Sequence, residues 1–427
     1  MTMRATLNKI YLYFALGSAT GVIPRIFGGH AAIHAGGESS MVSGGDRDPL
    51  LLFFNLAFGV STLLLAYAKL PRILAMLADL KGLITLHLYA AASILWSADP
   101  IATFRNIVYL FLFLVAAAYL AASFPFDTFI EHFGKAMAAF ALLSVPAQVL
   151  LPLPAYENSE WAGAFLHKNE LGVTMVFGIA SLMIAERPRR LMRVVAILLC
   201  FALLILSGSA GAFVWAFAGV STLVLMRLRG HVRFLFLTAL AGTLILAMAL
   251  VHNFISMAIG LVGKDATLTG RTAVWSVVLR MIVAHPLIGY GQGGFWPTSG
   301  GAVGAILGTW QPQHAHNGIL EICLNLGLIG LGLVILVLSD VFRQIRRLKD
   351  TAANNARIWG LTIAVIVLLH AADEATFLQL NCAWFVFLLA VFSLWRSNQE
   401  IHMHDFEVND EPHPEPTTPG DLMPAPN

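Results

Sequence analysis

Charged residues and cysteines are both scarce in this sequence. Only 12% of the 427 residues are charged, whereas 58% are hydrophobic, and the mean hydropathy is +0.76. Soluble domains carry about 25% charged residues, so a soluble protein is excluded and much of the surface is expected to face lipid. A net charge of +2 is too small for a nucleic-acid-binding protein. The three cysteines stand apart in apolar stretches, which excludes a disulfide framework and a cysteine-rich zinc site, and we expect them to be buried.

Long apolar stretches recur along most of the chain. A helix that spans a bilayer needs about 20 mostly apolar residues, and the first such stretch is interpreted as a span, not as a cleavable signal peptide. The sequence therefore predicts an all-α, polytopic transmembrane protein of about 12 spans. They run near 10–27, 50–68, 82–97, 104–123, 134–153, 171–186, 192–207, 209–227, 233–252, 317–341, 357–374 and 378–395.

The basic residues predict how these spans are oriented. Most of the 26 Lys and Arg residues fall in alternate loops, which places those loops and both termini in the cytoplasm. On the opposite side lies a large loop, residues 253–316, between spans nine and ten, with an amphipathic stretch from Ala273 to Val283 expected along the membrane surface. Residues 1–395 are thus predicted to form one integral membrane domain. Residues 396–427 are predicted to be a disordered, acidic, proline-rich cytoplasmic tail.

Unusual polar side chains gather on the side that the basic loops avoid. The clusters are Trp96 to Pro100 with Arg105, His167 to Glu170, Ser207 to Gly211, Gly270-Arg271 with Trp275, His314 to Asn317, and Asp373-Glu374. Ionisable groups at membrane depth are costly and by default mark function. The set offers Arg, Lys and His but no clustered carboxylates for a divalent metal, and the chain has no Walker-type loop. Neither a metal nor a nucleotide cofactor is therefore expected, and a lipid-linked diphosphate suits such a site as an already activated substrate.

His316 has the surroundings of a general base. It precedes Asn317, a good N-cap for the tenth span, and the positive end of that helix disfavours imidazolium. Nine residues separate Asn317 from Gly327-Leu328-Ile329-Gly330, whose spacing lets another helix approach closely.

These motifs resemble those of the O-antigen ligase and polysaccharide polymerase superfamily. The similarity rests on His316-Asn317 with Gly327-x-x-Gly330, and extends from about residue 90 to 395. Further matching motifs, in the expected order, are Trp96-Ser97-x-Asp99-Pro100 with Arg105, Gly163-x-Phe165-x-His167-Lys168-Asn169-x-Leu171-Gly172, Thr269-Gly270-Arg271-x-x-x-Trp275 and Pro286-x-x-Gly289-Tyr290-Gly291. One departure is Ala210, which stands where many members have Arg in a Ser-x-Ser turn, and it puts a phosphate role of this turn in doubt.

The resemblance implies a reaction as well as a fold. It implies metal-independent transfer of a glycan from a polyprenyl diphosphate to a sugar hydroxyl, at the periplasmic face of the bacterial inner membrane. His316 would act as the base on the acceptor hydroxyl, and Arg271 would hold the diphosphate. Lys168 and Arg105 are candidates for the same phosphate work. The remaining candidates for substrate binding are His314, Asn317, Asn169 and Trp275.

Several alternatives stay open. A polymerase would join lipid-linked repeat units, which the His-Lys-Asn and Thr-Gly-Arg forms favour slightly, whereas a ligase would move a finished O-antigen onto lipid A core. A chain-length regulator and a flippase are the expected protein partners, and no nucleic acid is expected. A polar-solute transporter is a more distant alternative, although we find no internal repeat and no charges near the bilayer midplane.

Some of the same residues have structural explanations. Asp99 is expected to cap the fourth span. Lys168 suits an interfacial lysine equally well, and Trp275 suits an aromatic belt as well as a sugar platform. Asp373 and Glu374 either close a helix end or bind acceptor sugars.

Overall fold

The computed structural model of the chain describes residues 3–27, 49–151, 161–187, 189–233, 271–296, 312–348 and 354–409. Over these residues its secondary structure is helical, with no strand, which confirms the all-α prediction. The helices are α1 (Met3–Ala19), α2 (Val22–Phe27), α5 (Pro49–Tyr67), α6 (Leu70–Asp79), α7 (Lys81–Ala92), η1 (Ser93–Trp96), α8 (Pro100–Ser123), α9 (Phe126–Leu150), α10 (Lys168–Ile184), α11 (Arg190–Leu206), α12 (Ala210–Arg227), α14 (Arg271–Ala284), α16 (Gly318–Arg347), α17 (Asn354–Asp373) and α18 (Cys382–Asn409).

Every predicted span except the ninth coincides with one of these helices or with a helix pair. The ninth, 233–252, lies almost wholly outside the described residues. Within the described part, six helices are long and apolar enough to cross a membrane: α5, α8, α9, α12, α16 and α17. Helices α6 and α7–η1, which meet at a bend of 94°, add a seventh if they form one span. The chain is thus a multi-pass membrane protein, while the count of 12 and the orientation stay predictions.

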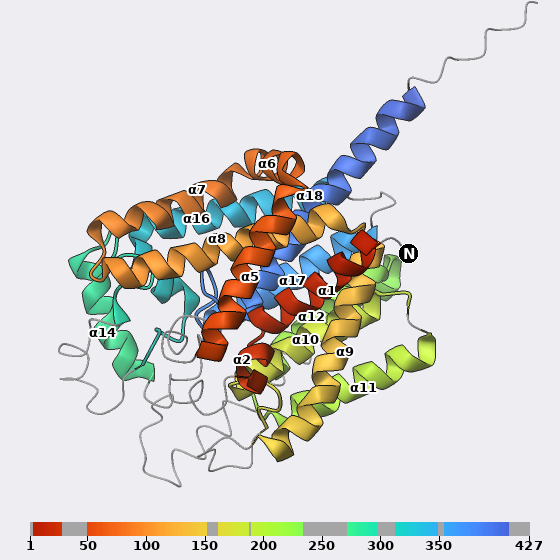
Figure 1. Cartoon of the computed structure of the whole chain (residues 1–427), viewed down its shortest axis with the longest axis horizontal. Coiled ribbons are helices and arrows are strands. Elements are labelled where there is room, and N and C mark those ends of the chain that lie inside the picture. The colour runs from red at the N-terminus through yellow and green to blue at the C-terminus, as the bar shows by residue number, and fades with distance from the viewer. Residues whose placement is uncertain are drawn as a thin grey trace, which may run out of the picture.

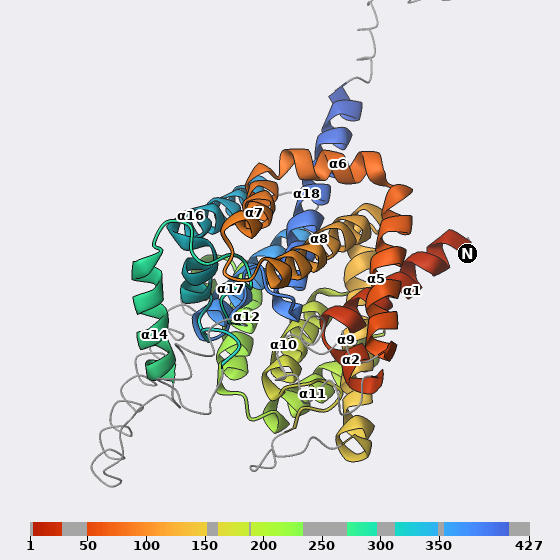
Figure 2. The same cartoon turned by 60° about the vertical axis from the view of Figure 1, so that its left-hand side comes forward.

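The core of the bundle lies around α18. This helix runs beside α8 and α17, and α17 in turn contacts α12 and α10 (Figures 1 and 2). Large side chains such as Trp384, Phe385, Trp359 and Phe177 are fully buried there. The three cysteines, including Cys382, are buried and free as predicted. Since lipid tails are as apolar as these side chains, close packing rather than exclusion from water holds such helices together.

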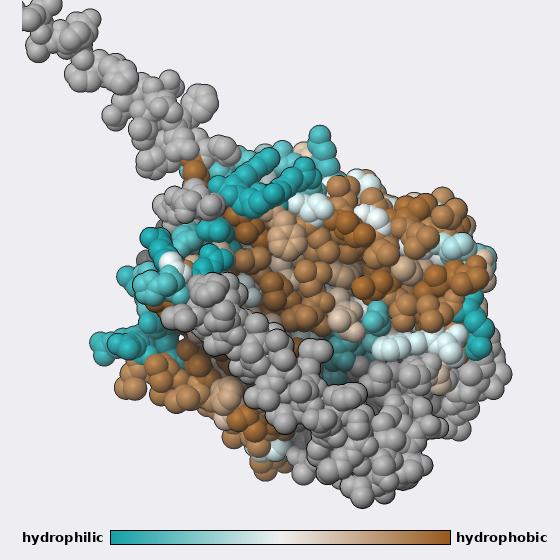
Figure 3. All heavy atoms as spheres, turned by 180° about the vertical axis from the view of Figure 1, so that it is seen from behind, coloured by the Kyte–Doolittle hydropathy of each residue, from teal (hydrophilic) through white to brown (hydrophobic). Residues whose placement is uncertain are grey.

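The outer surface is apolar in the manner of a lipid-facing bundle. Leu52, Phe53 and Leu56 of α5 and Leu198 of α11 are all more than two-fifths exposed. Figure 3 shows a broad hydrophobic area across one face, bordered above by hydrophilic residues. Contiguous exposed apolar area of this extent marks a membrane interface.

Helix α16 is broken at Gly327, which has a φ of 66°. In an unbroken helix the amides of Leu328 and Ile329 would bond to the carbonyls of Leu324 and Asn325. The segment after α14 takes those places instead. The amide of Leu328 donates to Pro286 O (2.8 Å) and that of Ile329 to Leu287 O (3.3 Å), while Leu324 O accepts from Tyr290 N and Asn325 O from Gly291 N, both at 2.9 Å.

This insertion corrects one prediction about the Gly-x-x-Gly motif. Gly327 does permit a close approach, but the neighbour is the backbone of Leu287 and Ile288 and not a second helix; a Cβ at Gly327 would overlap that backbone. The backbone N–H and C=O groups of a loop need hydrogen-bond partners. The broken turn of α16 supplies such partners, and these bonds hold the loop close to Gly327. Residues 286–296 are called the inserted segment below.

The amphipathic stretch after residue 270 is helical as predicted. It forms α14, which lies at one end of the bundle beside α16 (Figure 1). Val274, Val277 and Val278 of α14 pack with Phe295 and Ala315 in a small apolar cluster. Helix α14 is therefore attached to the inserted segment and to the residues just before α16.

Helix α18 continues beyond the boundary predicted for the C-terminal tail. The sequence predicts disorder from residue 396, whereas the helix ends at Asn409. Arg396 stabilises this extension, because its Nε lies 2.6 Å from Glu400 Oε1, one turn along the helix, and its Nη1 donates to Ala121 O at 2.8 Å. Residues 410–427 of the predicted tail lie outside the described residues.

Candidate active site

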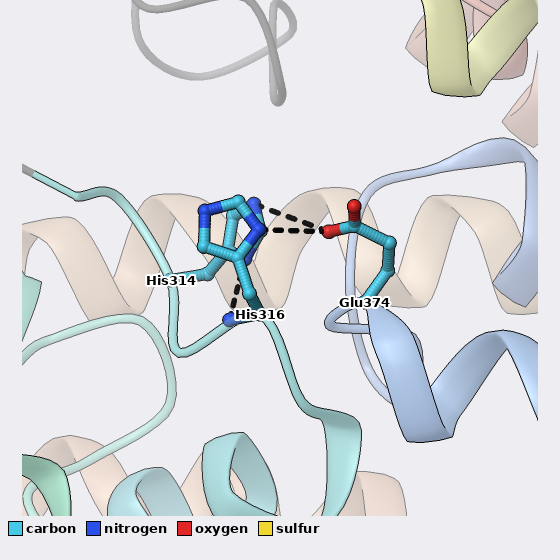
Figure 4. Close-up of side chains that lie close together, drawn as sticks. All are labelled: His314, His316 and Glu374. Atoms are coloured by element: carbon cyan, nitrogen blue, oxygen red, sulfur yellow. Dashed lines mark hydrogen bonds and ion pairs between the residues drawn. The ribbon is translucent and has the colours of Figure 1, made fainter. Parts of the chain in front are cut away.

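Two chain segments bring His314, His316 and Glu374 together. The histidines lie just before α16, and Glu374 directly follows α17; Figure 4 shows the two imidazole rings side by side, with the carboxylate directed at them. His316 Nδ1 lies 3.1 Å from Glu374 Oε2, and His314 Nε2 lies 3.9 Å from the same oxygen. The ring centroids of the two histidines are 4.1 Å apart. The His-Ala-His motif therefore acquires a carboxylate partner from a distant part of the chain.

The hydrogen bonds assign the protons on both rings. His314 Nδ1 accepts the backbone N–H of His316 at 3.1 Å, so in the neutral ring Nε2 carries the proton and faces Glu374. An ionised carboxylate only accepts, so His316 Nδ1 donates to Glu374. This tautomer leaves His316 Nε2 without a proton and able to take one from a substrate.

The surroundings of Glu374 keep its carboxyl group ionised. The side chain is only 8% exposed, and burial by itself opposes ionisation. The hydrogen bond that His316 Nδ1 donates favours the ionised form, outweighs burial and lowers the pKa of Glu374 well below its usual range. At neutral pH this residue is therefore a buried carboxylate that orients His316 and stabilises its protonated form.

Asn169 holds the other oxygen of Glu374. Its Nδ2 donates to Glu374 Oε1 at 2.8 Å, and its Oδ1 accepts from Ser209 Oγ at 2.9 Å. Ser209 is also the N-cap of α12. Two of the predicted polar clusters, His167 to Glu170 and Ser207 to Gly211, thus meet at Glu374, and the Ser-x-Ser turn contributes through Ser209 although it contains Ala210.

His316 has a strained backbone. Its φ is 46°, in the left-handed region, and only one other described non-glycine residue, Leu378 at 54°, has a positive φ. Such a conformation costs about 1–3 kcal/mol and is found mainly at functional sites. Asn317 then begins the helix, because its Oδ1 accepts from the amides of Ile319 and Leu320. The predicted N-cap is confirmed.

Leu378, the second strained residue, lies in the turn that carries Glu374. Its carbonyl accepts from Nε2 of Gln292 at 2.7 Å, and Gln292 is fully buried on the inserted segment. Near the end of α17, His370 Nδ1 lies 2.7 Å from Thr376 Oγ1 in this turn, and Thr376 Oγ1 donates to Glu374 O at 3.1 Å. The Glu374 turn is therefore fixed from two sides.

A small cavity of about 70 Å³, lined by polar and apolar side chains, adjoins this cluster. Its walls include His167 and Glu170 at the start of α10, His314 and Glu374, and Gln379 in the turn before α18. Amide, imidazole and carboxylate groups are the hydrogen-bonding groups that bind hydroxyls. The polar side chains of this lining can hydrogen-bond hydroxyl groups next to Glu374.

The other predicted site residues have varied positions. Trp275 of α14 donates from Nε1 to Ala315 O at 2.9 Å, which places it against the His-Ala-His segment. Lys168 is the first residue of α10, and Arg105 lies in the second turn of α8. Arg271 begins α14, and its side chain lies outside the described residues. The phosphate roles of Lys168, Arg105 and Arg271 stay predictions.

Asp99 is the N-cap of α8 as expected, since its Oδ1 accepts from the amides of Ile101 and Ala102.

Glu374 is the residue of this cluster whose role the sequence left open. It lies 58 residues from His316, and the sequence signal was only its position at the predicted outer end of a span.

His314, His316 and Glu374 also have the composition of a metal site, since one ligand atom of each lies within 4.8 Å of the others. The hydrogen bond from the His316 amide to His314 Nδ1 favours a different use. A neutral histidine that binds metal through Nε2 carries its proton on Nδ1, and that proton would face the His316 N–H. The donor set therefore fits a hydrogen-bonded His–Glu pair better than a bound cation.

Two sequence comparisons show which known proteins this chain resembles. The family model described as O-antigen ligase matches residues 194–335, a range that includes His314, His316 and Asn317. The exopolysaccharide production protein ExoQ of Rhizobium meliloti (strain 1021) is 27% identical over 304 residues, which cover 66% of this chain and 69% of that protein. Both findings confirm the resemblance of this membrane protein to the O-antigen ligase and polysaccharide polymerase superfamily.

Proposed function

We propose that this protein transfers a glycan from a polyprenyl diphosphate to a sugar hydroxyl, with His316 as the general base. The observation that carries the proposal is the 3.1 Å hydrogen bond between His316 Nδ1 and Glu374 Oε2, next to the cavity that Glu374 and His314 line. It leaves Nε2 of a 20% exposed histidine free of a proton. A base must lie within hydrogen-bond reach of the proton that it takes, so the proposal requires the acceptor hydroxyl to bind within that distance of His316 Nε2.

The proposed reaction balances within the two substrates. The acceptor hydroxyl gives its proton to His316 Nε2 while its oxygen bonds to the anomeric carbon of the donor sugar. The bond from that carbon to the phosphate oxygen breaks, and its electron pair leaves with the polyprenyl diphosphate. Glu374 stabilises the imidazolium that forms, and Arg271 stabilises the negative charge that develops on the diphosphate.

We further propose that the acceptor is itself lipid-linked, which makes the protein a polymerase of exopolysaccharide or O-antigen repeat units. The exopolysaccharide production protein among its relatives supports this choice. Ligation of a finished O-antigen to lipid A core is the alternative, and it uses the same base. The site is proposed to face the periplasm of the inner membrane, as the loop charges predict.

Transport of a polar solute is the candidate from another functional class. A gate needs charges that bind and release an ion or solute near the midplane. A strained histidine hydrogen-bonded to a buried carboxylate at a helix start is instead typical of an acid–base centre.

The test is replacement of His316 by alanine in a strain whose chromosomal copy is deleted. We expect the variant to reach normal membrane levels but to make no long polysaccharide. Loss of secreted polysaccharide with intact lipopolysaccharide would identify a polymerase, and accumulation of lipid-linked, full-length O-chain would identify a ligase. Wild-type glycan from the variant would rule out His316 as the base, and a defect only in uptake of a labelled solute would favour transport.

A further inference from the structure

Ala315, between the two histidines, has both of its backbone polar groups bound by side chains. Its N–H donates to Glu321 Oε2 at 2.8 Å, and its carbonyl accepts from Trp275 Nε1 at 2.9 Å. Ala315 is fully buried, so water does not replace either bond. These two contacts, from α16 and from α14, are called the Ala315 clamp.

Glu321 is nearly fully buried, at 2% exposure, and both of its oxygens are used. Besides the bond from Oε2 to Ala315, Oε1 accepts from Asn325 Nδ2 at 3.0 Å and from Trp296 Nε1 at 3.0 Å. Each of these donors is neutral. A buried carboxylate is expensive unless its lone pairs are filled. The bonds from Ala315 and Trp296 tie two other parts of the site to α16, and the bond from Asn325 lies within the helix.

The partners of Glu321 explain why this position needs two acceptor oxygens. Trp296 ends the inserted segment, Asn325 lies next to the break in α16, and Ala315 precedes the helix. A glutamine would offer one carbonyl oxygen and an NH₂ group, so Trp296 would have to rely on its longer 3.3 Å contact with the Oε2 position, and Asn325 would have to turn its amide over. The carboxylate meets all three donors without that rearrangement.

The clamp acts where the backbone is strained. His316 directly follows Ala315 and has a φ of 46°, and its amide is bonded to His314 Nδ1. A left-handed non-glycine residue persists only when its surroundings fix it. With both sides of Ala315 fixed, His316 cannot relax to a negative φ without breaking one of the clamp bonds.

We propose that Glu321, together with Trp275, is a positioning residue for the reaction. The Ala315 clamp keeps the His314-Ala315-His316 segment in the conformation that directs His316 Nδ1 at Glu374 and His316 Nε2 at the acceptor hydroxyl. This inference rests on the proposed function of His316 and assigns to Trp275 a positioning role in place of the predicted substrate contact.

The experiment compares purified Glu321→Gln with the wild-type protein in proteoliposomes, with a polyprenyl diphosphate-linked oligosaccharide as donor and acceptor. We expect kcat to fall about 100-fold, the loss typical of a catalytic group displaced by about 1 Å, with KM little changed. The pH profile of kcat should also shift, because His316 would lose its fixed distance to Glu374. A merely structural defect would lower the amount of active enzyme without moving the profile.

Glu131→Gln is the matched control, since it makes the same chemical change in α9, where Glu131 pairs with Lys135. We expect it to retain wild-type kcat and pH profile. If Glu321→Gln does not fold, Trp275→Phe removes the opposite bond of the clamp but keeps an aromatic side chain, and we expect the same fall in kcat and the same shift.

Wild-type kcat and pH profile in the variant tested would overturn the positioning role, provided that His316→Ala is inactive in the same assay. Activity in His316→Ala would instead overturn the proposed function itself. The two failures are therefore distinguishable in one set of measurements.

Discussion

Replacement of Glu374 by glutamine isolates the charge of the carboxylate from its shape. Glutamine can still accept the proton of His316 Nδ1 through its carbonyl oxygen, so the tautomer of His316 is kept. Its NH₂ group then faces Asn169 Nδ2, which at present donates to Glu374 Oε1. The Asn169 amide must therefore turn over, and Ser209, which now donates to Asn169 Oδ1, must accept instead. What is lost in full is the negative charge beside the imidazolium that forms during the reaction.

The size of the effect follows from the one bond that changes most. A hydrogen bond to a charged group contributes about 1.5–3 kcal/mol, and the bond at stake is the 3.1 Å contact with His316. Each 1.36 kcal/mol is about tenfold in rate, so we expect kcat of Glu374→Gln to fall by about 10- to 100-fold. Glu374→Ala also frees the tautomer of His316, and its loss should be larger, up to about 10⁴-fold as in other histidine–carboxylate pairs.

The assay is single-turnover transfer from a polyprenyl diphosphate-linked oligosaccharide in proteoliposomes, so that chemistry and not product release is measured. Donor binding should change little, because neither variant alters the cations proposed to hold the diphosphate. Glu131→Gln serves as the control for the same chemical change at a distant site. Single-turnover rates of Glu374→Gln and Glu374→Ala equal to that of the wild type would refute the catalytic pairing of Glu374 with His316.

Three further predictions address the fold, the diphosphate and the metal. Gly327→Ala should destabilise the detergent-solubilised protein by about 2–5 kcal/mol, since the new Cβ overlaps Leu287 and the φ is positive. The control is Gly332→Ala in the same helix, which has nothing within 4 Å and should be neutral or raise the Tm. Equal Tm values of the two variants would contradict the packing of the inserted segment against Gly327. Arg271→Lys should slow turnover at least about tenfold, because a point charge does not replace a bidentate fork, and near-normal turnover would remove that role. Activity should survive dialysis against EDTA, and a loss that Zn²⁺ restores would contradict the hydrogen-bonded pair.

Local sequence signals predicted the helices and their ends well. Apolar stretches marked the helices from α5 to α18, and cap residues such as Asp99 and Asn317 marked helix starts, because both signals depend on neighbours within a few residues. The short third span forms the helices α7 and η1. The hydropathy of the sequence did not predict the 94° bend between α6 and α7. The helical extension to Asn409 depends on contacts of Arg396 with another helix. The acidic composition of the tail did not indicate these contacts.

The site was predictable only in part. His316 could be named because its motif lies within one short segment, whereas its pairing with Glu374 needs α16 and α17 to lie side by side. The broken turn at Gly327 likewise has a local sequence signal, two glycines three residues apart. Its partner, however, is a loop some 40 residues earlier in the chain, and backbone hydrogen bonds connect the two. Backbone hydrogen bonds between distant segments leave no signature in side-chain identity, and buried acceptors such as Glu321 resemble ordinary first-turn acids.

The most direct test of the central claim is the transfer reaction itself, reconstituted with purified wild-type protein and His316→Ala. Polyprenyl diphosphate release and lengthening of the acceptor glycan should be measured together at saturating donor, with binding of donor measured separately. We predict that His316→Ala binds donor as the wild type does and releases less than about one hundredth as much diphosphate. Equal release and equal glycan lengthening by the two proteins would contradict His316 as the base.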